Sequence, residues 1–103
     1  MQIPPNLRKK SFAIYGLGNT GRSVINYFNK FGFKNYFIWD DNKFLQNSWH
    51  LDKKKEKIFL KSINFVDYIV ISPGIRLKKT RIGKVLLKNK HKLITDLDLF
   101  YML

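Results

Sequence analysis

Cysteine is absent from this 103-residue sequence, which excludes both a disulfide framework and a metal site built from thiolates. Long apolar runs are missing as well. No segment approaches the roughly 20 apolar residues that cross a bilayer, and residues 1–10 lack the apolar stretch of a secretory signal peptide. No period of about 20 to 50 residues repeats, which disfavours a solenoid. We therefore expect a cytoplasmic globular protein with no membrane partner.

Acidic residues are scarce, with seven Asp and Glu against 20 Lys and Arg and a net charge of +13. Such an excess is typical of nucleic-acid-binding proteins, but compositional drift toward lysine produces it too. The lysines are scattered, and the one dense cluster, Lys53–Lys57, predicts a solvated turn. We favour drift and expect no nucleic-acid partner, although the positive field would still attract a small anionic ligand.

Short apolar runs predict the strands of a buried sheet. Four runs are clear: Phe12–Tyr15, Tyr36–Trp39, Tyr68–Ile71 and Leu93–Thr95. A fifth, Ile58–Leu60, indicates a short edge strand. Because helical segments alternate with these runs, the pattern predicts a Rossmann-like, three-layer α/β domain over residues 1–103, with a mostly parallel sheet of about five strands.

Helical periodicity appears between the strands. Apolar spacings of three and four predict helices at Thr20–Phe31, Lys79–Asn89 and Leu97–Leu103, and weakly at Leu60–Phe65. Gly32 is the expected stop of the first helix. Thr95 and Asp98 resemble a capping box at the start of the last one, which should expose apolar surface and favour aggregation.

A glycine-rich turn, Gly16-Leu17-Gly18-Asn19-Thr20-Gly21, follows the first strand and opens the first helix. In this context Gly16 permits a tight turn, Gly18 admits a diphosphate close to the backbone, and Gly21 allows close packing of the helix. The N–H groups of Asn19, Thr20 and Gly21, with the positive end of the helix dipole, would face the anion. The turn therefore predicts a phosphate site, the alternative being a glycine turn without a ligand.

Acidic and amide side chains end the second strand at Asp40, Asp41 and Asn42. An acid in this position commonly accepts hydrogen bonds from a nucleotide, but Asp40 is equally well explained as a turn residue on spacing alone. Asp41 and Asn42 fit a turn better than a site.

Ser72, Pro73 and Gly74 follow the third strand. Gly74 would let a ligand approach the backbone and Ser72 could donate one hydrogen bond, although spacing alone favours a plain strand-to-loop transition. The carboxyl ends of parallel strands share one edge, so all three motifs are expected at one crevice. His50 and His91 lack partners at metal-ligand spacing, so we expect no metal site.

Taken together, these motifs resemble the beginning of a Mur ligase. The resemblance runs from about Ser11 to Phe100 and rests on Ala13–Ser23, Asp40–Asn42, Asp67–Ile75 and Ile94–Phe100. It implies the first of three domains, the one that binds the UDP end of a UDP-sugar-peptide, specifically UDP-N-acetylmuramoyl-L-alanine in a ligase that adds D-glutamate. The remaining ligase domains would be its partners.

The resemblance also assigns roles to residues. It implies that Gly18, Asn19, Thr20 and Gly21 hold the diphosphate, that Asp40 contacts uracil with Asp41 and Asn42 beside it, and that Ser72, Pro73 and Gly74 line the same pocket. In that family ATP and Mg²⁺ bind a second domain through a G-[ST]-N-G-K-[ST] loop, which this chain lacks. No cofactor is therefore expected on this domain, and no catalytic residue or ligase activity in this chain.

Two other functions remain open from the sequence. An NAD(H)-binding regulatory domain shares the glycine turn and the acid after the second strand, but Ser72–Gly74 and the Asp96–Phe100 ending fit it poorly. A small basic nucleic-acid-binding protein rests on charge alone.

Overall fold

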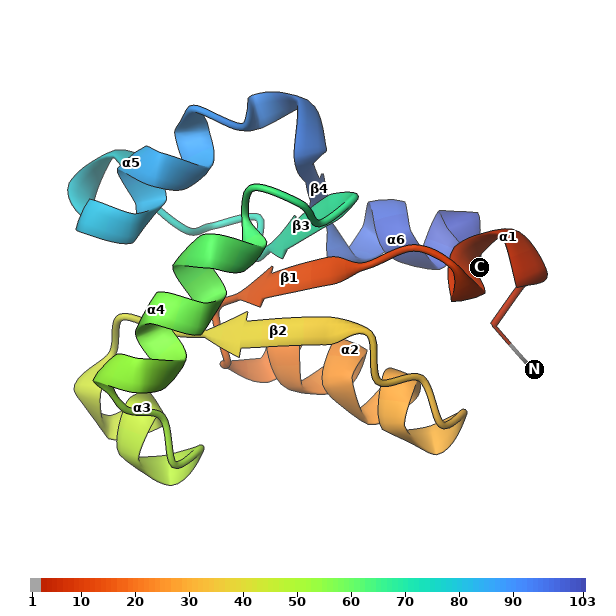
Figure 1. The fold of residues 1–103 in the computed structure, drawn as a ribbon, viewed down its shortest axis with the longest axis horizontal. Coiled ribbons are helices and arrows are strands. Elements are labelled where there is room, and N and C mark those ends of the chain that lie inside the picture. The colour runs from red at the N-terminus through yellow and green to blue at the C-terminus, as the bar shows by residue number, and fades with distance from the viewer. Residues whose placement is uncertain (1–2) are drawn as a thin grey trace.

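The protein, seen in a computed structural model, contains one four-stranded parallel sheet (Figure 1). The structure describes residues 3–103. Met1 and Gln2 lie outside the described residues, although the predicted domain and the segment 1–10 considered for a signal peptide both include them. The strands stand in the order β2–β1–β3–β4. Their bounds are β1 Phe12–Tyr15, β2 Tyr36–Trp39, β3 Tyr68–Ile71 and β4 Leu93–Thr95.

The predicted Rossmann-like α/β class is confirmed, and the four clear strands lie where the apolar runs place them. Strand β1 lies between β2 and β3, with Phe12 level with Tyr36 on one side and with Tyr68 on the other. The count is four rather than about five, because Ile58–Leu60 belongs to a helix.

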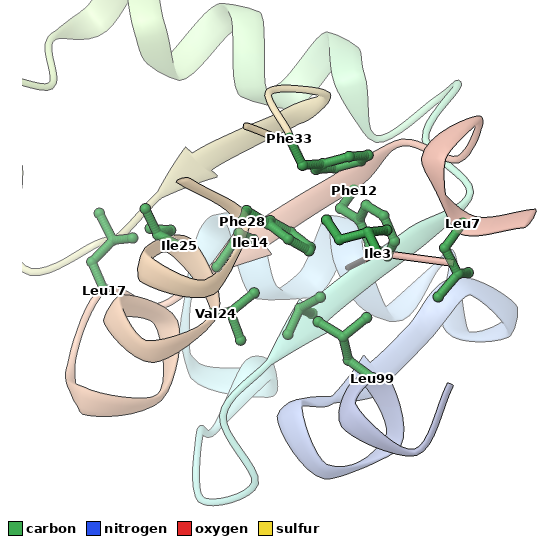
Figure 2. Close-up of a cluster of buried hydrophobic side chains, with 11 residues drawn as sticks. Ile3, Leu7, Phe12, Ile14, Leu17, Val24, Ile25, Phe28, Phe33 and Leu99 are labelled. Atoms are coloured by element: carbon green, nitrogen blue, oxygen red, sulfur yellow. The ribbon is translucent and has the colours of Figure 1, made fainter. Parts of the chain in front are cut away.

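Helices cover both faces of the sheet, and alternate side chains of β1 point into two separate cores. Phe12 and Ile14 pack with α2 (Asn19–Lys30), α6 (Asp96–Met102) and α1 (Pro5–Arg8). Figure 2 shows this cluster, in which the Phe12, Phe28 and Phe33 rings lie close together. The second core, on the other face, holds Ala13 and Tyr15 and is formed with α4 (Lys53–Ser62) and α5 (Arg81–Leu87). The two cores account for the three-layer arrangement.

The segment from Lys53 to Ser62 corrects three expectations. The solvated turn at Lys53–Lys57 and the edge strand at Ile58–Leu60 are both wrong, because these residues form the single helix α4. The helix predicted at Leu60–Phe65 overlaps only its end. Asp52 begins α4 by accepting a hydrogen bond from Lys55 N at 2.9 Å, and Phe59 and Ile63, four residues apart, are buried against the sheet.

Other helix boundaries also differ from the predictions. Neither α1 nor α3 (Lys43–Ser48) was expected; Asn42 caps α3 by accepting from Leu45 N at 3.0 Å. The helix predicted at Lys79–Asn89 is instead a 3₁₀ turn, η1 (Leu77–Lys79), then α5, then a second 3₁₀ turn, η2 (Lys90–Lys92). Thr80 separates η1 from α5, because its extended backbone and its hydroxyl, which accepts from Gly83 N at 2.8 Å, cap α5.

The first and last predicted helices are shifted by one residue and otherwise confirmed. Helix α2 ends before Gly32, whose φ of +69° lies in the left-handed region that glycine favours. The capping box of α6 is present, with Thr95 and Asp98 exchanging hydrogen bonds. Helix α6 exposes apolar side chains as expected, with Tyr101 92% exposed. Within residues 3–103, none of the helices combines the length and the apolar character needed to span a membrane.

Candidate functional site

The three predicted motifs meet at the carboxyl edge of the sheet. The turn Gly16–Gly21 follows β1, Asp40–Asn42 follows β2, and Ser72–Gly74 follows β3. In Figure 1 the arrows of β1, β2 and β3 point toward this edge, and α3 and α5 flank it on opposite sides; β4 runs parallel to β3. The β1 and β3 motifs are in direct proximity, because a Cβ built on Gly16 would lie 3.5 Å from Ser72 Oγ and 3.7 Å from Ile75 Cδ1.

The glycine turn has a backbone that only small residues permit. Gly16 has a φ of +105°, which disfavours any side chain. A Cβ on Gly21 would lie 1.8 Å from the Gly16 carbonyl oxygen, so the first turn of α2 packs directly on the turn that precedes it. Gly18, by contrast, is exposed and has no atom within 4 Å of a built Cβ. The turn is therefore closed on its inner side and open on its outer side.

Backbone N–H groups line the open side of this turn. The amides of Gly18, Asn19, Thr20 and Gly21 have no acceptor within residues 3–103, whereas the next amide, Arg22 N, donates to Gly18 O at 3.0 Å. Free amides at the amino terminus of a 12-residue helix, aligned with the positive end of its dipole, attract anions. The free amides agree with the geometry expected from the sequence, and phosphate binding at this turn stays a prediction.

Asp40 connects the glycine turn to the loop after β2. Its carboxylate accepts hydrogen bonds from Leu17 N and from Asn42 N, each at 2.7 Å, while its carbonyl accepts from Gln46 Nε2 at 3.0 Å. A carboxylate offers about four lone-pair positions, so two remain for a ligand. Asp40 thus stabilises the turn, which fits its interpretation as a turn residue. Its carboxylate can still accept a hydrogen bond from a ligand N–H or O–H.

Asp41 is held by two buried side chains. Its carboxylate accepts from the Tyr15 hydroxyl and from Trp39 Nε1, the latter at 3.1 Å, and the Tyr15 oxygen also lies 3.0 Å from Thr80 Oγ1. Burial, followed by the hydrogen bond to Asp41, raises the pKa of Tyr15 well above its ordinary value, so the hydroxyl remains a donor. Tyr15 and Thr80 were missed from the sequence, where Tyr15 is simply an apolar strand residue.

The remaining predicted residues are exposed or serve local structure. Asn42 caps α3, which agrees with its interpretation as a turn residue. Pro73 and Gly74 are exposed, and a Cβ on Gly74 would meet no atom within 4 Å. Ser72 is half-buried beside Gly16, and its carbonyl accepts from Ile75 N at 3.2 Å.

A hollow of about 430 Å³ begins one residue beyond the glycine turn. Arg22 and Asn26 of α2 form one wall, and the other, from α3 and the residue after it, consists of Phe44, Leu45, Ser48 and Trp49. Arg22, the residue that follows Gly21, contributes a positive charge to the lining of this hollow. The edge of the sheet therefore offers a row of free amides, a carboxylate with spare acceptor capacity and a cavity whose lining begins at Arg22.

The family model that matches this chain is described as the Mur ligase MurD-like, N-terminal domain, and the match spans residues 10–94. The chain belongs to this family. The MurD-like match includes all three motifs of the carboxyl edge, and it confirms the resemblance noted in the sequence.

Two curated proteins are similar to this MurD-like chain. One is a UDP-N-acetylmuramoylalanine--D-glutamate ligase of Wolbachia pipientis wMel, 32% identical over 96 residues. The other, from Wolbachia sp. subsp. Brugia malayi (strain TRS), carries the same name and is 32% identical over 99 residues. Each alignment covers 90% of this chain but only 19% and 20% of the relative, so the chain spans about a fifth of their length. No solved structure matches the chain significantly.

Proposed function

We propose that this chain holds the UDP end of UDP-N-acetylmuramoyl-L-alanine, as the amino-terminal part of an ATP-dependent ligase that adds D-glutamate during peptidoglycan synthesis. The observation that carries the proposal is the row of free amides from Gly18 to Gly21 beside the Asp40 carboxylate. The amides suit a diphosphate, and the carboxylate suits a base or ribose that donates a hydrogen bond. The identity of the proposed substrate is inferred from the names of the Wolbachia relatives.

Each predicted residue has a place in this proposal. The amides of the glycine turn bind the diphosphate, and the spare lone pairs of Asp40 accept from the uracil N–H. The other residues shape the walls: Asp41, Asn42, Ser72, Pro73 and Gly74.

ATP does not fit this chain. The sequence has no G-x-x-x-x-G-K-[ST] loop, and the glycine turn carries no lysine to reach a terminal phosphate. We therefore assign ATP and Mg²⁺ to the remaining domains of the ligase, which would be this domain's partners. We expect the isolated chain to release no ADP in the presence of substrate and D-glutamate; release that depends on D-glutamate would contradict this.

Isothermal titration calorimetry with three ligands tests the proposal. UDP-N-acetylmuramoyl-L-alanine should bind the purified chain, and NADH should not. Tight NADH binding without binding of the UDP-sugar would instead indicate an NAD(H)-binding regulatory domain. Duplex DNA binding that exceeds that of both small ligands would favour a nucleic-acid-binding protein.

A pair of variants tests the position of the site. Gly18→Asp places a negative charge at the open side of the turn, where no protein atom is displaced, and should abolish binding of the UDP-sugar. Asn47→Asp makes the same change in charge on an exposed position of α3 and should leave binding within about twofold of the wild type. Equal binding by the two variants would place the ligand elsewhere.

A further inference from the structure

The segment that follows the third motif carries a long run of cationic side chains without an acidic one. Between Arg76 and Lys92 lie eight cationic side chains and no acidic one: Arg76, Lys78, Lys79, Arg81, Lys84, Lys88, Lys90 and Lys92. We call this the basic band; it runs over η1, α5 and η2. Acidic residues are absent from all of residues 68–95. The band therefore carries eight cationic side chains in 17 residues, against six in the longer acid-free stretch of residues 1–39.

Most of this charge is uncompensated. Arg81 pairs with Glu56 at 2.9 Å, and Lys92 Nζ donates to the Ile63 carbonyl at 2.8 Å. The other six cations have no hydrogen-bond or ion-pair partner within residues 3–103, and all six are exposed. Like charges along one segment repel one another, and a bound anion would relieve that repulsion.

A hollow of about 410 Å³ lies within the band. Its floor is apolar, formed by Ile75, Leu77 and Leu87, and its rim carries Arg76, Lys78 and Lys79. Leu77 is 7% exposed, so the floor is fixed by the second core. The hollow thus offers room for one apolar group surrounded by cations.

The chemistry of the band discriminates between polyanions. Nucleic acid is disfavoured because the band contains no Phe, Tyr or Trp on which a base could stack, its one aromatic ring being the imidazole of His91, and six of its eight cations are lysines, which lack the planar fork of arginine. An anionic lipid surface is disfavoured because the large exposed apolar side chains all lie outside the band. An acidic protein segment matches both the cationic rim and the apolar floor.

We propose that the basic band docks an acidic protein segment that inserts one apolar side chain between Leu77 and Leu87 while its carboxylates meet Arg76, Lys78 and Lys79. None of the predicted UDP-site residues lines this hollow; the two sites adjoin at Ile75, which lies in the floor of the hollow and 3.7 Å from a Cβ built on Gly16. The proposal holds whether or not the chain binds UDP.

Fluorescence anisotropy with a short labelled peptide of Asp and Glu around one central leucine tests this proposal. The double variant Lys78→Glu, Lys79→Glu should weaken binding about tenfold or more. The control Lys53→Glu, Lys54→Glu makes the same change in net charge at the exposed start of α4 and should weaken binding less than about twofold. A peptide with glycine in place of leucine should bind the wild type about tenfold more weakly.

Four results would overturn the proposal. The first is that the peptide does not bind, and the second is that both double variants lose affinity equally, which means that charge acts without a defined surface. The third is that the glycine peptide binds as well as the leucine peptide. The fourth is that duplex DNA or phosphatidylglycerol vesicles depend on Lys78 and Lys79 more strongly than the peptide does. Calorimetry with the UDP-sugar should give the same affinity for the Lys78, Lys79 variant as for the wild type, which separates this test from that of the UDP site.

Discussion

Replacement of Gly21 by alanine should disrupt the fold at the start of α2. The new Cβ would lie 1.8 Å from the Gly16 carbonyl oxygen and 2.9 Å from its carbon. Unstrained carbon–oxygen contacts are about 3.3 Å or longer, so the two segments must separate by about 1.5 Å. The Gly16 peptide cannot easily move, because Gly16 N donates to Trp39 O at 2.9 Å and the next amide is held by Asp40.

The expected loss in the free energy of unfolding follows from this rigidity. Overpacking typically costs about 1–3 kcal/mol, and a collision with anchored backbone belongs at the upper end, near 3 kcal/mol. Gly18→Ala is the matched control, because its Cβ meets no atom within 4 Å and its φ of −74° suits any residue. It should change the free energy of unfolding by less than about 0.5 kcal/mol, while its methyl group weakens binding of the UDP-sugar.

Urea denaturation followed by far-ultraviolet circular dichroism measures both variants, and calorimetry measures their ligand binding. The expected result is a clear fall in the unfolding midpoint for Gly21→Ala alone. If Gly21→Ala unfolds at the wild-type urea concentration, the close packing of α2 on Gly16 is not a feature of the protein in solution. If Gly18→Ala binds the UDP-sugar as the wild type does, the diphosphate does not lie against this turn.

Three further predictions concern other parts of the molecule. Tyr15→Phe removes the hydroxyl that bonds to Asp41, and should lower the free energy of unfolding by about 1–3 kcal/mol in urea titrations. Because the folded pKa of Tyr15 is raised above its ordinary value of 10.0, its contribution is complete below about pH 10, and the wild-type advantage should shrink as the pH rises above 10; a constant difference would contradict this. Asp40→Asn should weaken UDP-sugar binding about tenfold in calorimetry, and unchanged affinity would remove Asp40 from the site. The double variant Leu97→Glu, Tyr101→Glu should reduce concentration-dependent association measured by light scattering, because it removes exposed apolar side chains from α6. A wild-type chain that stays monodisperse at high concentration would contradict this prediction.

The strands were predictable because each is a short apolar run buried on both faces. The β1 run Phe12–Tyr15 contributes side chains to both cores, so its sequence is continuously apolar, and a glycine turn marks its end. The convergence of the three motifs followed from parallel topology alone. Only tertiary structure could add that Ser72 lies beside Gly16.

Helix α4 was not predictable from its apolar pattern, because only Phe59 and Ser62 are buried within it. Six of its ten residues are Lys or Glu, which are good helix formers, but their dense charge predicted a solvated turn instead. The signal that could have located its start is Asp52, the N-cap. Thr80 is the corresponding missed signal for α5.

The hydrogen-bonded bridge from Leu17 to Asp40 has a kinetic consequence. Together with the bond from Gly16 N to Trp39 O, it fixes the shape of the glycine turn before any ligand arrives. A nucleotide that meets a preformed row of amides need not wait for the backbone to rearrange, so its association should be a single concentration-dependent step without a slower isomerisation. Differences in affinity among related ligands should then appear almost entirely in how fast each one leaves.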